Sequence, residues 1–181
     1  RAMLNADELS SAIGYIIGGK PYIKGVYGLK PTCEWLPGGT LAQAVRTWST
    51  ARLVIAPHGA GSTNLLFMPP GSTIVEIIRS DQKGRVYKKL AQISGHYYIK
   101  CTYNLKDAAF RPQLVGTQRT GDNFILNLPW FLRCLQRGFM HRNAQRVNSS
   151  DMASGPRYVD PFSKDAWGRL QELLGEPPLP S

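Results

Sequence analysis

The segment from Leu53 to Glu76, LVIAPHGAGSTNLLFMPPGSTIVE, constrains the fold of this chain more than any other. Its apolar run at Ala51–Ala56 predicts a buried strand, the glycines after it predict a turn, 62–68 predicts a turn or two of helix, and Thr73–Ile78 predicts a second buried strand. The start of a helix offers unpaired backbone N–H groups and partial positive charge. The segment therefore predicts a site for a phosphate-bearing ligand.

The alternation of strand and helix continues on both sides of this segment. A helix is expected at 6–18, with Asn5 as its N-cap, and another after Thr40, with apolar residues at helical spacing at Leu41, Ala44, Val45 and Trp48. Residues 86–94 predict a helix and 97–102 a strand. This order predicts an α/β fold, a Rossmann-like parallel sheet with helices on both faces.

The character of the sequence changes after Tyr103. Residues 104–123 are polar and irregular, whereas 127–146 predict an amphipathic helix and 164–174 a last short one. The apolar side of the longer helix is expected to contain Trp130, Phe131, Cys134, Leu135 and Phe139. We therefore expect a domain at 1–103 and a helical or irregular extension at 104–181 that packs on it.

Composition narrows the class of protein. The chain has 181 residues, 43% of them hydrophobic, which suits a globular domain, and no apolar run is long enough to span a membrane. Its 22 Lys and Arg exceed its 12 Asp and Glu, which favours anionic partners such as phosphates, nucleic acid or acidic lipid without choosing among them. The three cysteines include no CxxC pair, so no zinc site is indicated, and one disulfide stays open.

The glycine turn supplies the first candidate site residues. His58 can donate from its ring, the backbone from Gly59 to Thr63 can donate N–H groups, and Ser62 and Thr63 add hydroxyls. The pattern matches neither GxGxxG nor the Walker motif, which disfavours simple dinucleotide or nucleoside-triphosphate binding. A tight structural turn with a hydrogen-bonded histidine is the alternative interpretation of the same residues.

Four motifs in order resemble the C-terminal domain of glycosyltransferase family 61. The strongest is HGAGSTNLLFMPPG, from His58 to Gly71, in which Ser62 replaces the family's usual leucine. The others are RAMLN at residues 1–5, TLAQ at residues 40–43, in which Ala42 replaces an acidic residue, and Val75-Glu76-Ile77. The resemblance covers residues 1–103 and leaves 104–181 unmatched.

This resemblance implies the C-terminal half of a GT-B fold, two Rossmann-like domains that face each other. Family members are inverting transferases that use a nucleotide sugar, here expected to be UDP-linked, and a glycan or protein acceptor. No metal or other cofactor is expected, and the sequence has no DxD motif. The first strand of this domain is expected just before Arg1, and the catalytic base, which deprotonates the acceptor, is expected in a facing N-terminal domain outside this chain.

The resemblance also gives roles to individual residues. His58 and the backbone of Gly59, Ala60, Gly61, Ser62 and Thr63 are expected to bind the diphosphate, and His58 to stabilise the leaving group. Glu76, placed at a strand end, is expected to accept hydrogen bonds from ribose hydroxyls, and Arg1 and Asn5 to reach the phosphates. Asn64 is expected to tie the loop.

Two functions of different class remain open. The first is a glycosyltransferase, which in a eukaryote implies the lumen of the Golgi or endoplasmic reticulum. The second is an inactive relative kept as a structural subunit of a large assembly, an organellar ribonucleoprotein or a membrane complex, with RNA or protein as partner. The basic charge and the aromatic, Arg-bearing helix at 127–146 suit the second.

Overall fold

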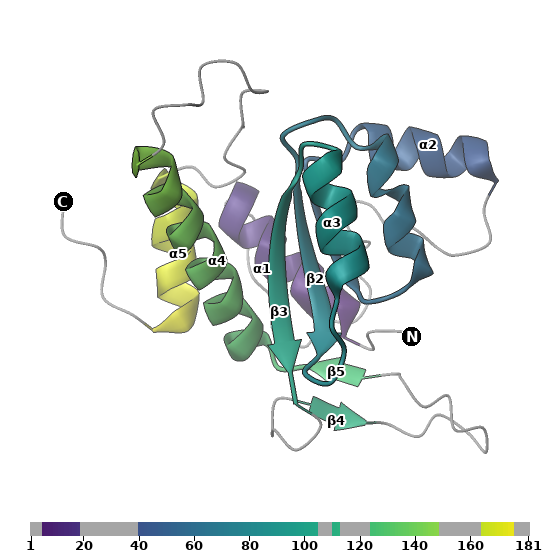
Figure 1. The fold of residues 1–181 in the computed structure, drawn as a ribbon. Helices are drawn as coiled ribbons and strands as arrows, with labels where there is room; N and C mark the ends of the chain where they lie inside the picture. The colour runs from purple at the N-terminus through teal and green to yellow at the C-terminus, as the bar shows by residue number, and fades with distance from the viewer. Residues whose placement is uncertain (1–4, 19–39, 105–109, 113–123, 149–163, 176–181) are drawn as a thin grey trace. The chain divides into compact units, whose positions relative to one another are not determined.

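The computed structural model describes residues 5–18, 40–104, 110–112, 124–148 and 164–175 (Figure 1). The chain divides into two compact units, each assembled from segments that are distant in the sequence. One consists of Arg1–Glu34, Lys106–Arg133 and Asp160–Ser181, and the other of Trp35–Leu105 and Cys134–Val159. We call them the helical unit and the sheet unit. The division predicted at residue 103 stays a prediction.

The sheet unit contains three parallel strands in the order β1-β2-β3. They are β1 (Leu53–Pro57), β2 (Thr73–Arg79) and β3 (Tyr97–Tyr103). The register aligns Val54 with Ile74 and Ile74 with Tyr98. The predicted α/β fold with a parallel sheet is therefore confirmed.

One face of this sheet is covered by the connections between its strands. The helix η1 (Ala60–Phe67) connects β1 to β2, α3 (Arg85–Ile93) connects β2 to β3, and α2 (Leu41–Ser49) packs against η1 (Figure 1). Consecutive parallel strands in sequential order require crossovers of one hand, so both connections lie on one face. The apolar cluster beneath them contains Trp48, Leu65, Met68, Ile74, Tyr87 and Ala91.

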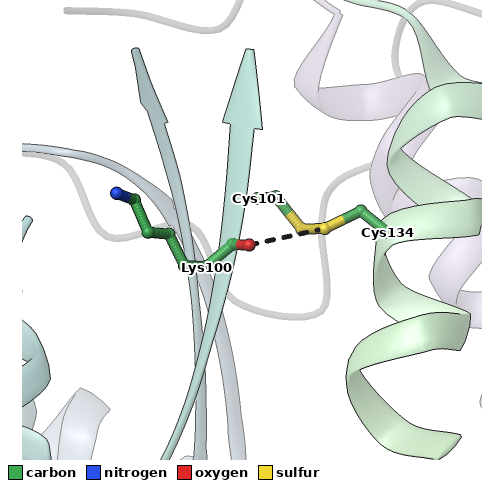
Figure 2. Close-up of a disulfide and its surroundings, with 3 residues drawn as sticks. All are labelled: Lys100, Cys101 and Cys134. Carbon is green, nitrogen blue, oxygen red and sulfur yellow. Dashed lines mark hydrogen bonds between the residues drawn. A yellow bond between two sulfur atoms is a disulfide. The ribbon is translucent and has the colours of Figure 1, made fainter. Parts of the chain in front are cut away.

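The other face of β3 contacts the helix α4 (Leu128–Asn148), whose part from Cys134 onward belongs to the sheet unit. Cys101 of β3 forms a disulfide with Cys134 of α4, with 5.8 Å between their Cα atoms (Figure 2). One turn further along α4, Gly138 lies so close to Ile99 that an added Cβ would be 2.6 Å from its Cγ2. The sheet thus has helices on both faces, as predicted.

Burial differs between the strands. Residues 73–78 of β2 are all buried, as predicted, because β2 is the middle strand. The expectation of a buried strand at Ala51–Ala56 is wrong in part: β1 runs from Leu53 to Pro57 and is half-buried throughout. It pairs with β2 alone in the described sheet, and an edge position also tolerates Pro57, which lacks an N–H.

The helix α2 has the predicted N-cap, but the burial of its residues differs in part from the periodic pattern. Its predicted N-cap is confirmed, since Thr40 accepts from Gln43 N while Gln43 Oε1 accepts from Thr40 N, a capping box. Of the four residues expected on its buried face, Ala44 and Trp48 are buried, whereas Leu41 and Val45 are exposed.

The helical unit contains α1 (Ala6–Gly18), α5 (Lys164–Leu174) and a short antiparallel pair, β4 (Phe110–Pro112) and β5 (Phe124–Leu126). The helices α1 and α5 pack together, and Arg169 Nε donates to Ile16 O at 2.9 Å. The three predicted helices at 6–18, 127–146 and 164–174 are confirmed, the middle one as Leu128–Asn148. The strands were not predicted, because three residues are too few to show an alternating pattern.

None of the helices that the structure describes combines the length and the apolar character needed to cross a membrane.

Candidate functional site

The glycine loop lies directly after β1, at the edge where the parallel strands end. His58 N donates to Ile77 O at 2.8 Å, which holds the start of the loop against β2. The first hydrogen bond of η1 then runs from Ser62 N to Gly59 O at 3.0 Å. Within the described part of the chain, the N–H groups of Ala60 and Gly61 precede this bond and have no acceptor. They are thus free to donate to a ligand.

The helix expected at residues 62–68 is η1, a 3₁₀ helix at Ala60–Phe67. Side chains tie its first turn. Thr63 Oγ1 donates to Ala60 O at 2.7 Å, and Asn64 Nδ2 donates to Gly61 O at 3.0 Å. These bonds occupy carbonyls one turn back, as in tight i to i+3 geometry. The tying role expected of Asn64 is confirmed.

The packing of the described residues does not explain why residue 59 is a glycine. Its backbone is fully extended, with φ 174° and ψ 168°, a conformation open to any residue. Among the atoms of the described residues, the nearest to an added Cβ would be Pro57 O at 4.0 Å. Glycine at such a position fits a need for close approach by something other than the chain itself.

His58 and Glu76 form the polar centre beside the loop. The distance from His58 Nδ1 to Glu76 Oε1 is 2.6 Å, and Tyr98 donates its hydroxyl to Glu76 Oε2. The His58 side chain is 26% exposed whereas that of Glu76 is 1% exposed. The carboxylate is therefore buried with both oxygens hydrogen-bonded, and the histidine connects it to the surface.

The expectation that Glu76 stands at a strand end is wrong. Glu76 is the fourth of seven residues in β2 and pairs with Ala56 and Lys100 in the neighbouring strands. A buried carboxylate is tolerated here because His58 and Tyr98 donate to it. Its predicted contact with ribose stays a prediction, and such a contact would have to compete with these two partners.

Tyr98 was missed as a site residue. The signal was present in the sequence, since alternation along β3 places Tyr98 on the face of the sheet that contains Ile74 and Glu76. Burial, with the hydrogen bond to Glu76 as second cause, raises the pKa of Tyr98 far above its usual range. Its hydroxyl thus stays protonated and remains a donor.

Gly84 and Tyr87 complete the surroundings of the pair. Gly84, before α3, has φ +57°, and an added Cβ would be 3.3 Å from Tyr98 Oη and 3.4 Å from Glu76 Oε2. A side chain there would be strained and would crowd the pair. The rings of Tyr87 and His58 lie edge-on, with 5.3 Å between their centroids. Burial raises the pKa of Tyr87.

Of the remaining predicted residues, one belongs to the loop and the others do not. Ser62, the loop residue, is buried within η1. Asn5 belongs to the helical unit, where its amide donates to Leu126 O and accepts from Leu126 N, each at 2.8 Å. The same amide donates to Glu8 Oε2 at 3.2 Å, so Asn5 links α1 to β5. Arg1 lies outside the described residues. Their predicted phosphate contacts stay predictions.

Within the described residues, no three His, Cys, Asp or Glu side chains gather in a way that would hold a metal ion. Beside the buried carboxylate of Glu76, the polar groups of the loop are backbone N–H donors, hydroxyls and one imidazole. Such donors suit an anion rather than a cation.

A parallel sheet with a glycine loop at the carboxyl end of a strand defines a Rossmann-like α/β protein. Residues 33–75 match the family model described as Glycosyltransferase 61, so this segment of the chain is similar to that family. The match confirms the resemblance drawn from the motifs within residues 33–75. It includes the glycine loop and the TLAQ motif at the start of α2, and it ends one residue before Glu76. A comparison with curated proteins finds no match to the chain.

Proposed function

We propose that the sheet unit binds the diphosphate of a nucleotide sugar at the loop from His58 to Thr63, as the donor site of a glycosyltransferase. The observation that carries this proposal is Gly59, an extended glycine whose Cβ position is open among the described residues. Beside it are the N–H groups of Ala60 and Gly61, which have no acceptor within the described part of the chain. A diphosphate oxygen can approach these groups closely only if no side chain stands between them.

The chemistry of transfer suits this donor set. As the bond between sugar and diphosphate breaks, negative charge develops on the departing phosphate oxygen. Backbone N–H groups at the start of η1 and a protonated His58 stabilise that charge without a metal ion. We further propose that the acceptor is deprotonated by a group from a facing GT-B domain, with inversion at the sugar.

Calorimetric titration with uridine diphosphate tests the donor site. A folded sample is expected to bind the ligand, and His58→Ala is expected to weaken binding about tenfold or more, the loss of one charge-assisted hydrogen bond. Titration with inorganic pyrophosphate at the same salt concentration separates recognition of the nucleotide from general attraction of anions to a basic protein.

Binding of uridine diphosphate, or its absence, distinguishes a glycosyltransferase from a structural subunit. No heat at millimolar uridine diphosphate, with folding verified by circular dichroism, would refute the donor site and favour the structural-subunit alternative. An unchanged affinity in His58→Ala would remove His58 from the site.

A further inference from the structure

The hydrogen bonds around Glu76 have a fixed direction. Tyr98 can only donate to Glu76 Oε2, because a carboxylate has no proton to give and the raised pKa of Tyr98 keeps its hydroxyl protonated. His58 Nδ1 must then carry the proton that points at Glu76 Oε1, 2.6 Å away. The ring nitrogen left for a ligand is Nε2.

The second described histidine is held the opposite way. His96 is 6% exposed and places Nε2 3.0 Å from Leu65 O, a carbonyl within η1. A carbonyl only accepts, so His96 carries its proton on Nε2, and within the described residues its Nδ1 has no partner. The two histidines flank the same helix with opposite tautomers.

The position of the proton on the His58 ring affects how the ring can bind an anion. A neutral His58 with its proton on Nδ1 presents a lone pair at Nε2, which repels a phosphate oxygen. Protonation of Nε2 converts it into a donor and gives Glu76 a cationic partner. A charged ring would then have the Glu76 carboxylate at Nδ1 and the bound anion at Nε2.

We propose that Tyr98 is a positioning residue, which holds Glu76 so that His58 directs Nε2 at the loop and takes up a proton when a diphosphate binds. This inference rests on the donor site proposed above. A carboxylate with two fixed donors cannot rotate away from the imidazole, just as an outer partner fixes the ring of a metal ligand.

Among the described residues around His58, Glu76 is its charged partner. Tyr98 of β3 is linked to His58 through Glu76, and Tyr87 of α3 contacts the His58 ring directly. Both are neutral phenols with a raised pKa. Lys100 is next to Glu76 in register but is exposed, with Nζ 3.5 Å from Gln82 O. The side chains of η1 carry no charge, and the cations of α3, Arg85, Lys88 and Lys89, are exposed.

The ligand-free protein tests the positioning directly. Nitrogen-15 spectra of the imidazole rings report which nitrogen carries the proton. At a pH where the rings are neutral, His58 is expected as the Nδ1–H form and His96 as the Nε2–H form. A His58 ring with its proton on Nε2 would overturn the proposal, whatever the protein binds.

Tyr98→Phe tests the link to the ligand, because it removes only the hydroxyl. Its affinity for uridine diphosphate is expected to fall about three- to tenfold, the effect of about one hydrogen bond. Tyr97→Phe is the matched control, since Tyr97 is the half-buried neighbour whose side chain points to the other face of β3. Equal affinities in Tyr98→Phe and Tyr97→Phe would overturn the role of Tyr98.

The dependence of the affinity for uridine diphosphate on pH measures how many protons the protein takes up on binding. Above about pH 7 the terminal phosphate of uridine diphosphate is mostly ionised, so its own charge changes little. Between about pH 7 and 9 the wild-type affinity is expected to fall as the proton on Nε2 becomes harder to gain, and the affinity of His58→Gln is expected to stay flat. The same slope in both proteins would overturn proton uptake. Absent binding by the wild type would instead refute the donor site and leave the result on the ring nitrogens standing.

Discussion

His58 and Glu76 are 18 residues apart in the sequence, yet Nδ1 of the one lies 2.6 Å from Oε1 of the other. The parallel register produces this contact, because His58 N donates to Ile77 O and so fixes the residue after β1 beside the middle of β2. The bond gives a buried carboxylate a partner that also reaches the surface. Glu76 therefore contributes both to the stability of the sheet and to the position of His58 in the candidate site.

This coupling predicts non-additive losses of stability. Glu76→Gln is expected to lower the free energy of unfolding by about 1–3 kcal/mol, since hydrogen bonds to a charged group are weakened, and Tyr98→Phe by about 1–2 kcal/mol. The double variant is expected to lose clearly less than the sum, because both changes act on one bond. Urea denaturation of the four proteins measures this. Additivity within about 0.5 kcal/mol would show that the two residues act independently.

Gly59→Ala separates binding from folding. The added methyl group has open space and the extended backbone accepts it, so the free energy of unfolding is expected to change by less than about 1 kcal/mol. Affinity for uridine diphosphate is nevertheless expected to fall about tenfold or more, since the methyl group occupies the approach to the loop. A destabilised protein, or one that still binds normally, would argue that Gly59 is only a turn residue.

The glycine loop and the parallel strands could be predicted because both follow from local pattern. Apolar runs defined β2 and β3, and the residues of the loop suggested its chemistry. The position of Glu76 could not be predicted in this way, because its burial depends on partners from β1 and β3 that only the register brings together. Tyr98 was missed for the same reason, and Leu41 resembled a buried residue because spacing does not reveal where a helix ends its contact with the core.

The disulfide between Cys101 and Cys134 is expected to stabilise the sheet unit. It closes a loop with a sequence separation of 33, which corresponds to about 3–4 kcal/mol in the chain-entropy treatment. The oxidised sulfur of Cys134 carries no proton, so its 3.7 Å approach to Lys100 O is a contact that becomes a weak hydrogen bond only after reduction (Figure 2). The weak hydrogen bond from the Cys134 thiol would offset little of the stability lost when the disulfide is reduced.

Urea denaturation with and without a thiol reductant measures the effect of the disulfide. The wild type is expected to lose stability on reduction, whereas the variant with both Cys101→Ala and Cys134→Ala is expected to be insensitive to the reductant. Equal stability of oxidised and reduced wild type would contradict the prediction. Because disulfides persist in oxidising compartments, a stabilising bond here would fit a protein that folds in such a compartment.

Gly138 and Gly168 provide a matched pair of helical glycines. An added Cβ at Gly138 would be 2.6 Å from Ile99 Cγ2. At Gly168 in α5 an added Cβ would meet no atom of the described residues within 4 Å. Gly138→Ala is therefore expected to destabilise the protein by about 1–3 kcal/mol through overpacking, and Gly168→Ala to stabilise it by about 0.5–1 kcal/mol through helix propensity. Thermal unfolding compares the two. Stabilisation by both substitutions would show that α4 does not press on β3 at Ile99.

His96 predicts acid sensitivity of the fold. Burial lowers the pKa of His96 below its ordinary value of 6.5, and the hydrogen bond to Leu65 O opposes that shift only in part. The unfolded chain therefore binds a proton more readily than the folded one, so the stability that this residue contributes is complete above about pH 6.5 and is lost as the pH falls toward the lowered value. His96→Gln keeps a donor for Leu65 O but does not titrate. Its free energy of unfolding, measured by urea between about pH 7 and 5, is expected to fall less steeply than that of the wild type, and parallel curves would show that His96 protonates equally in both states.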